Sequence, residues 1–188
     1  MKRAEKKAMT RKKILAAATV LYGKKGFVEV SIEEISRQAE VGKGTVFLHF
    51  VNQDRLMEEV ISQLLKDFDY QMQTGMIASL EDYLFLHLSV LEQYEDLYVY
   101  FITQRLLLNQ EVSYLYVSIQ AAFAHHFERA VNDTLSLPLA VLFTNWLGFI
   151  HYYLENRDLF GGKNIIKRNK AYWIEQFLTL VYKGGIKK

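Results

Sequence analysis

Polar side chains in the segment from Lys43 to His49 have types and spacing that suit contact with nucleic acid. Lys43 can neutralise a phosphate or donate a hydrogen bond to a base edge, and the Thr45 hydroxyl can donate to a phosphate or place its methyl group on a thymine. Gly44 lets a phosphate approach the backbone N–H closely. His49, one turn later, can reach a phosphate or a base edge. A solvated lysine and a histidine that only caps its helix remain the alternatives.

A short helix from about Lys43 must hold these residues. Val46 and Phe50 are one turn apart and are expected to face inward, which leaves Lys43, Thr45 and His49 on the outside. The spacing therefore predicts a helix whose early residues are presented to an external partner.

The segment just before it predicts another short helix. Ser31 with Glu34 three residues later is a capping box, which supplies partners to backbone N–H groups at a helix start. Ile32, Ile35 and Ala39 follow at helical spacing and give this helix one apolar face.

A tight turn, Glu40-Val41-Gly42, separates the two predicted helices. Gly42 is expected to adopt the left-handed backbone that a sharp reversal can require. Two short helices joined this way are typical of a helix-turn-helix, whose second helix enters the major groove of DNA. By spacing alone, an ordinary helical hairpin in an all-α domain is an equal alternative.

The chain resembles the tetracycline-repressor (TetR) family of bacterial transcription regulators over roughly residues 8–68. The matching parts are the helix Thr10–Gly26 ending in Gly-Phe, Ser31-Ile-Glu-Glu-Ile, Ala39, Val41, Lys43-Gly-Thr, His49-Phe50 and Asn52. The resemblance implies a three-helix DNA-binding head and a fourth helix that links the DNA backbone to a ligand cavity.

Four residues depart from the family pattern. Glu40 stands where the turn usually has glycine, and Gly42 stands where a small hydroxyl residue is common. Phe47 replaces the usual tyrosine and cannot donate a phenolic hydrogen bond to phosphate, while Leu48 offers only an apolar contact. We therefore infer from the resemblance that the chain binds DNA, but we infer no operator sequence.

The expected DNA contacts lie on the second helix, at the cap of the first helix and at the start of the fourth. Ser31 is expected to serve both as a helix cap and as a phosphate donor, and Arg55 has the alternative of pairing with Glu58 or Glu59. The full set is Ser31, Lys43, Gly44, Thr45, Phe47, Leu48, His49, Gln53 and Arg55.

Composition and periodicity predict an all-α protein of two domains, residues 8–68 and 69–188. Helical periodicity recurs at residues 10–25, 53–73, 79–94, 97–109, 113–132, 137–156 and 168–182. Residues 1–55 hold 12 Lys/Arg against 6 Asp/Glu, and residues 56–188 hold 11 against 15, which suits a basic DNA-binding head on a mildly acidic body. The residues from Lys2 to Lys7 could instead be a solvated tail.

The chain has no cysteine, its N-terminus lacks an apolar signal-peptide core, and its longest apolar run is short for a membrane span. We expect a cytoplasmic protein without membrane contact. His125 and His126 point about 100° apart on a helix and make a poor metal pair. No catalytic arrangement, metal site or cofactor is predicted.

The predicted second domain is rich in aromatic residues at helical spacing, which suits either a packed core or the wall of a cavity for a small hydrophobic or aromatic effector. Arg105 has two interpretations, an anionic ligand or an internal acid such as Glu111. The candidate ligand residues are Tyr98, Phe101, Arg105, Tyr116, Gln120, Phe123, Asn145, Trp146 and Phe149.

The helices near residues 137–156 and 168–182 are candidates for a homodimer interface, because each carries an apolar surface that needs a cover. Burial within one chain is the alternative. The candidate residues are Leu147, Ile150, His151, Leu154, Tyr172, Ile174, Phe177, Leu178 and Val181.

These features favour a homodimeric, one-component transcription regulator, most consistent with a repressor that binds a palindromic operator and responds to a ligand. A second hypothesis keeps the same head on a body that only dimerises. A third, from another functional class, is a helical small-molecule carrier or enzyme with a vestigial head.

Overall fold

The computed structural model describes residues 3–131 and 137–184, and in these residues all regular structure is helical. The predicted all-α class is confirmed. The predicted helix end at residue 132 lies outside the described residues. The elements are α1 (Arg3–Lys25), α2 (Ile32–Gln38), α3 (Lys43–His49), α4 (Gln53–Thr74), α5 (Leu80–Gln93), α6 (Glu95–Gln104), the 3₁₀ turn η1 (Arg105–Leu107), α7 (Gln110–Ala130), α8 (Leu139–Glu155), the 3₁₀ turn η2 (Arg157–Phe160) and α9 (Ile165–Gly184).

Contacts within the chain define two compact units. The first unit consists of Met1–Leu65 and Asp96–Tyr116, and the second of Lys66–Glu95 and Val117–Lys188. Each unit is therefore built from two separate stretches of sequence, whereas the predicted domains are continuous segments that meet between residues 68 and 69.

Helix α1 begins at Arg3, seven residues before the predicted start at Thr10. No glycine or proline interrupts this stretch, and Glu5 in the first turn is favourable at the positive end of the helix dipole. Most of the basic N-terminal segment is thus helical, although Lys2 lies outside the described residues. The helix ends as predicted at Gly26, whose φ of 84° is left-handed and whose N–H donates to Tyr22 O at 2.9 Å.

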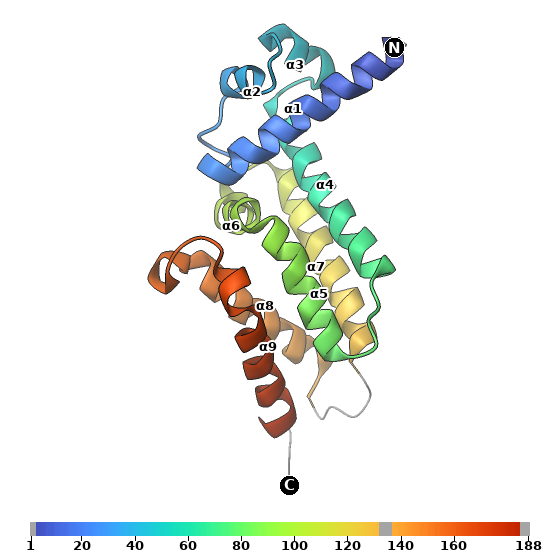
Figure 1. The fold of residues 1–188 in the computed structure, drawn as a ribbon, viewed down its shortest axis with the longest axis vertical. Coiled ribbons are helices and arrows are strands. Elements are labelled where there is room, and N and C mark those ends of the chain that lie inside the picture. The colour runs from blue at the N-terminus through green and yellow to red at the C-terminus, as the bar shows by residue number, and fades with distance from the viewer. Residues whose placement is uncertain (1–2, 132–136, 185–188) are drawn as a thin grey trace. The chain divides into compact units, whose positions relative to one another are not determined.

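The core of the first unit is formed by the apolar faces that the periodicity predicts. Ile14, Tyr22, Ile35, Val46 and Leu56 are all fully buried. Helix α2 contacts both α1 and α3, so the three helices form one cluster (Figure 1). Burial, aided by the nearby Asp54 carboxylate, raises the pKa of Tyr22, which keeps its phenol neutral inside this core.

Residues 96–116 complete the first unit. The N–H of Phe27 donates to Gln104 Oε1 at 2.8 Å, across 77 residues of sequence. A Cβ added at Gly26 would lie 2.5 Å from Gln104 Nε2, so this glycine is required both by its backbone angle and by close packing.

The core of the second unit is aromatic. The rings of Phe68 and Phe123 lie 4.1 Å apart between centroids, and those of Trp146 and Phe177 lie 4.9 Å apart. Trp146 Nε1 donates to His87 Nδ1 at 2.8 Å inside this core. Burial lowers the pKa of His87 to about 3, with a smaller contribution from His151. The imidazole is therefore neutral at neutral pH.

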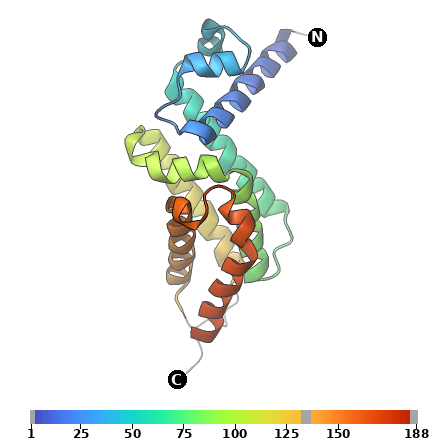
Figure 2. The same ribbon diagram turned by 60° about the vertical axis from the view of Figure 1, so that its left-hand side comes forward.

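Helices α8 and α9 form a hairpin connected through η2, and α9 packs along α5 (Figure 2). The start of α9 is held by Glu95, only 6% exposed, whose carboxylate accepts from Ile165 N at 3.2 Å and Ile166 N at 3.0 Å. This carboxylate satisfies N–H groups that have no partner inside their own helix. None of the helices in the described ranges is long and apolar enough to cross a membrane.

Candidate nucleic-acid interface

Helix α3 has the orientation that its residue types predict. Val46 and Phe50 are buried beneath it, at 0% and 3% exposure. Lys43 and Gly44 are exposed, and Thr45 and His49 are half-buried at the surface. Leu48 is 81% exposed, which is unusual for leucine and leaves its side chain available to an apolar partner. The helix is therefore anchored from one side and presents the other.

The turn between α2 and α3 corrects one expectation. Gly42 has φ −70° and ψ 147°, an extended conformation that any residue can adopt, and it precedes the first turn of α3. The left-handed residue is Glu40, with φ 56°. Gly42 was the wrong choice because the chain reverses two residues earlier, where Val41 N donates to Ser36 O at 3.0 Å. A glutamate at this position carries backbone strain that glycine would not.

Gly44 has no intramolecular reason to be glycine. A Cβ built on it meets no atom of the described chain within 4 Å. The absence of a side chain therefore leaves the surface of α3 open at this position, and the role of Gly44 toward phosphate stays a prediction.

Lys43 is held by an acid that the sequence reasoning did not single out. Its ammonium forms an ion pair with Glu33 on α2, and both side chains are about half exposed. The pKa of the Glu33 carboxyl is lowered, chiefly by its hydrogen bond from Lys43. A spacing of ten residues across a turn gives no periodic pattern, so only the packing of α2 against α3 shows this pair.

His49 is neutral rather than charged at this surface. Its pKa is lowered by burial first, and then by the positive charges of Lys7 and Arg11. Its Nδ1 atom is buried and has no hydrogen-bond partner in the described chain. The side chain therefore supplies no charge at neutral pH, and its buried Nδ1 is not accessible to an external partner.

Arg11 of α1 is a further basic residue beside α3, and the sequence reasoning missed it. Its Nη1 donates to His49 O at 2.7 Å, its guanidinium lies 4.2 Å from the Phe50 ring centroid, and it pairs with Glu59. A shallow pocket of about 320 Å³ lies here, lined by Ala4, Lys7, Ala8, Arg11, Leu48 and His49. The basic character of residues 2–13 was the available clue, but their position beside α3 required the tertiary structure.

Among the remaining predicted DNA contacts, Phe47 is 44% exposed, whereas Ser31, Gln53 and Arg55 are engaged within the chain. Ser31 Oγ accepts from Glu34 N at 3.3 Å, which confirms the capping box. Hydrogen bonds from Lys25 and then Ser31 lower the pKa of Glu34 to about 2. Gln53 donates to a backbone carbonyl, Val30 O, at 2.5 Å. Their roles toward phosphate stay predictions.

Arg55 adopts the alternative left open by the sequence. Its Nη1 lies 2.6 Å from Glu58 Oε2, and the other oxygen of Glu58 accepts from Asn109 Nδ2 at 3.1 Å. Contact between Arg55 and a phosphate would have to compete with this pair.

The candidate effector residues are divided between the two units. Tyr98, Phe101, Arg105 and Tyr116 belong to the first, where Arg105 lies 4.4 Å above the Tyr116 ring and Phe101 is fully buried. In the second unit Phe123 and Trp146 are buried, Phe149 and Gln120 are half-buried and Asn145 is exposed. The Nε2 atom of Gln120 is buried without a partner in the described chain.

Many candidate dimer residues lie inside the second unit. Ile150, Leu154, Ile174, Phe177 and Val181 are between 0% and 5% exposed, which is the alternative that the sequence left open. Tyr172 is 56% exposed, and Leu147, His151 and Leu178 are half-buried. An interface on these helices would use the second group, with the buried residues supporting it from below.

Comparison with known proteins connects the first unit to one family. Residues 14–60 match the family model described as bacterial regulatory proteins, tetR family. The chain is 33% identical over 70 residues to the uncharacterised HTH-type transcriptional regulator YhgD of Bacillus subtilis, covering 37% of each. It is 29% identical over 69 residues to the probable HTH-type regulator YttP of the same species, covering 37% of this chain and 33% of YttP. The alignments thus span about a third of these relatives' length.

Solved structures resemble the chain over most of its length. A transcriptional regulator of Aquifex aeolicus VF5, described as TerR/AcrR family, has a TM-score of 0.76 at 20% identity and covers 91% of this chain and 99% of its own. A transcriptional regulator from Rhodococcus sp. Rha1 has a TM-score of 0.74 at 12% identity and covers 95% and 99%. At these identities the likeness establishes the fold.

Proposed function

We propose that this chain, which belongs to the tetR family of bacterial regulatory proteins, binds double-stranded DNA through its first unit and regulates transcription. The observation that carries the proposal is α3 itself. Its inner residue Val46 and the capping residue Phe50 are buried, while Lys43, Gly44 and Leu48 are exposed together on the outside. The matched family segment, residues 14–60, includes the whole of this helix.

The charge distribution supports the same partner. The excess of basic residues lies within residues 1–55, and Lys7, Arg11 and Lys43 are near or on α3. Polyanionic DNA gains affinity from such residues by release of its counterions. Ser31, Lys43, Gly44, Thr45, Phe47, Leu48, His49, Gln53 and Arg55 are the contacts that we propose.

We further propose a homodimer that acts as a repressor on an approximately palindromic operator in the cytoplasm. A dimer places two α3 helices in successive major grooves, so its symmetry is matched by two half-sites. The exposed Tyr172 and half-buried Leu147 and His151 are the residues we assign to this interface. A small effector would weaken operator binding by favouring a conformation in which the two heads no longer match the grooves.

A body that dimerises and senses no ligand is the second candidate. The dense ring packing of Phe68, Phe123, Trp146 and Phe177 favours it, because aromatic residues used as core are not free to line a cavity. Members of this family are regulators rather than enzymes, and we set aside the hypothesis of a carrier or enzyme with a vestigial head.

Selection of bound genomic fragments by the purified protein at near-physiological salt tests DNA binding. We expect a recovered palindrome, and a variant carrying Lys43→Ala with Thr45→Ala should bind it roughly 100-fold more weakly. Lys167→Ala, an exposed charge on α9, is the matched control and should leave affinity unchanged. Full retention of specific affinity in the double variant would refute the assignment of α3.

Sedimentation of the protein at micromolar concentration tests the dimer. A monomer under these conditions would contradict the two-half-site model. In the DNA-selection experiment, salt-sensitive binding without sequence preference would favour a non-specific DNA-binding protein.

A further inference from the structure

Helix α3 depends on its neighbours for its direction. It has seven residues, too few for a helix to be stable alone, so contacts from other elements must hold it in place. It packs on α2, and Val46 and Phe50 are buried beneath it. The carbonyl groups of its last turn have no partner inside the helix. The groups that bond to these carbonyls therefore determine how the end of α3 is held.

Arg11 supplies such a partner from α1. Its Nη1 donates to His49 O at 2.7 Å, and His49 is the last residue of α3. A hydrogen bond from a charged donor is stronger than one between neutral groups, and a positive charge is favourable at the negative end of the helix dipole. Arg11 thereby ties the end of α3 to α1 across 38 residues of sequence.

Two further contacts fix the Arg11 guanidinium in one orientation. Its central carbon lies 4.2 Å from the centroid of the Phe50 ring, and Phe50 is only 3% exposed. Its Nη2 pairs with Glu59 on α4. The planar guanidinium uses two nitrogens and one face at the same time, which the single ammonium of lysine cannot do. One side chain therefore connects α1, α3 and α4.

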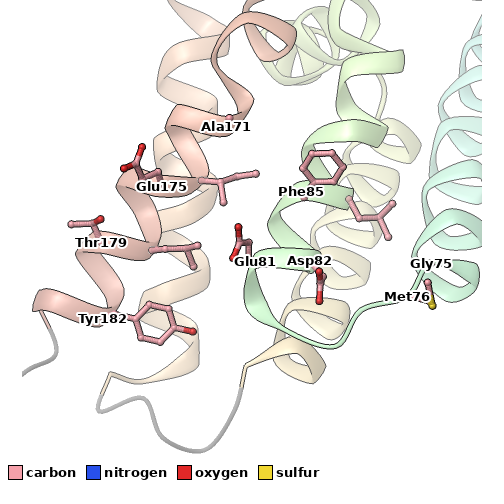
Figure 3. Close-up of a pocket in the computed structure, with 12 residues that line it drawn as sticks. Gly75, Met76, Glu81, Asp82, Phe85, Ala171, Glu175, Thr179 and Tyr182 are labelled. Carbon is pink, nitrogen blue, oxygen red and sulfur yellow. The ribbon is translucent and has the colours of Figure 1, made fainter.

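A lysine in the second unit shows the difference between the two cations. Lys170 on α9 has its Nζ 4.6 Å from the Phe85 ring centroid, 2.9 Å from Glu92 Oε2 and 3.0 Å from Ser89 Oγ. These three partners all lie on α5, and Figure 3 shows Phe85 on that helix, across from α9. Lys170 therefore joins two helices, whereas Arg11 joins three.

We propose that Arg11 is a positioning residue for DNA recognition, which fixes the direction of α3 by holding its C-terminal end. The inference rests on the proposed function, because it concerns how α3 fits the major groove. Base contacts depend on that fit, whereas binding to any duplex depends on the number of positive charges. Specific binding thus requires the shape of the Arg11 side chain, and its charge alone does not suffice.

Arg11→Lys tests the proposal because it keeps the charge and removes the planar fork. Affinity for the palindrome recovered by DNA selection should fall roughly tenfold, while affinity for non-specific duplex and its salt dependence stay unchanged. Arg129→Lys, the same change at an exposed position of α7, is the matched control and should bind like the unchanged protein. Full specific affinity in Arg11→Lys would overturn the proposal, because charge alone would then suffice.

Amide hydrogen exchange, followed by NMR on the full chain without DNA, separates positioning from direct contact with DNA. The Phe50 amide, which donates to Val46 O at 2.9 Å, should exchange roughly tenfold faster in Arg11→Lys. The Ala39 amide, which donates to Ile35 O at 2.9 Å at the end of α2, should exchange as in the unchanged protein.

Two results of this exchange experiment would overturn the proposal. Unchanged exchange at Phe50 together with weaker specific binding would mean that Arg11 contacts DNA directly. Equal acceleration at Phe50 and Ala39 would mean that the variant only lowers the stability of the unit.

Failure of this inference is distinguishable from failure of the proposed function. If the unchanged protein recovers a palindrome but the Phe50 amide does not respond to Arg11→Lys, only this inference fails. If the amide responds but the unchanged protein selects no DNA, the proposed function fails while Arg11 still positions α3.

Discussion

The two units differ in where their charged and polar side chains lie. In the first unit the cations near α3 are paired with acids at the surface, as in Lys43 with Glu33 and Arg11 with Glu59. In the second unit polar groups are enclosed, as with His87 in the aromatic core and Glu95 at the start of α9. Exposed ion pairs contribute little and exchange readily for DNA phosphates, whereas buried polar groups are costly to disturb. The first arrangement suits binding, and the second suits stability.

The largest effect should come from the aromatic core of the second unit. Trp146→Ala removes a fully buried ring that also donates to His87, and we expect a loss of about 3–5 kcal/mol in the free energy of unfolding. Denaturant titration followed by the fluorescence of Trp173 measures this unit, because both tryptophans lie in it. Tyr152→Ala, at an exposed position of α8, is the control. An equal loss of unfolding free energy in this control would contradict the prediction that the buried aromatic core stabilises the second unit.

Acid should destabilise the second unit through His87. Its pKa is about 3 in the fold and about 6.5 when unfolded, so between these values the unfolded state binds one more proton. The contribution of neutral His87 to the free energy of unfolding is fully present above pH 6.5. Below pH 6.5 the free energy of unfolding should fall by up to about 1.4 kcal/mol for each pH unit. His87→Gln should remove this part of the slope in tryptophan fluorescence titrations. An identical slope in the variant would refute the role of His87.

The buried carboxylate at the start of α9 should come next. Glu95→Ala leaves the N–H groups of Ile165 and Ile166 without their acceptor, and we expect a loss of about 2–3 kcal/mol in unfolding free energy. Chemical denaturation of the variant measures it. Glu155→Ala, an exposed glutamate, should change stability little. Similar changes in unfolding free energy for the two variants would mean that the burial of Glu95 does not contribute to stability.

A smaller, stabilising effect is expected in the first unit. Glu40→Gly relieves the left-handed backbone at φ 56°, and the gain should be about 0.5–1 kcal/mol after the added flexibility of the unfolded chain is counted. Far-UV circular dichroism during thermal unfolding measures it. Glu29→Gly, in the loop before α2, should be neutral or destabilising. Destabilisation by Glu40→Gly would show that this side chain has a role beyond the turn.

The smallest effect concerns DNA affinity. Glu33→Gln frees Lys43 from its ion pair, and binding to non-specific DNA should rise roughly twofold to fivefold, most clearly at low salt. Fluorescence anisotropy with labelled duplex measures it. Glu29→Gln removes the same charge without touching Lys43. A matching rise in that control would mean that net charge, not the pair, controls affinity.

Local sequence determined the helices and their inner faces. The capping box Ser31–Glu34, the C-cap at Gly26 and the inward residues Val46 and Phe50 were all predicted correctly. These features depend on residues within one or two turns of each other, so a linear pattern contains them. The all-α class and the resemblance to the tetR family were likewise evident from ordered local motifs.

The tertiary structure decided which distant residues meet. It placed Arg11 against His49, Gln104 against Phe27 and Glu95 at the start of α9, across 38, 77 and 70 residues. It also showed that the turn residue with a left-handed backbone is Glu40 and not Gly42. Sequence periodicity identifies several apolar helix faces but does not tell which of them is buried. Long-range packing determines which face is buried and which polar atoms are removed from solvent. For that reason the buried state of Ile150 and Phe177 could be known only from the folded chain.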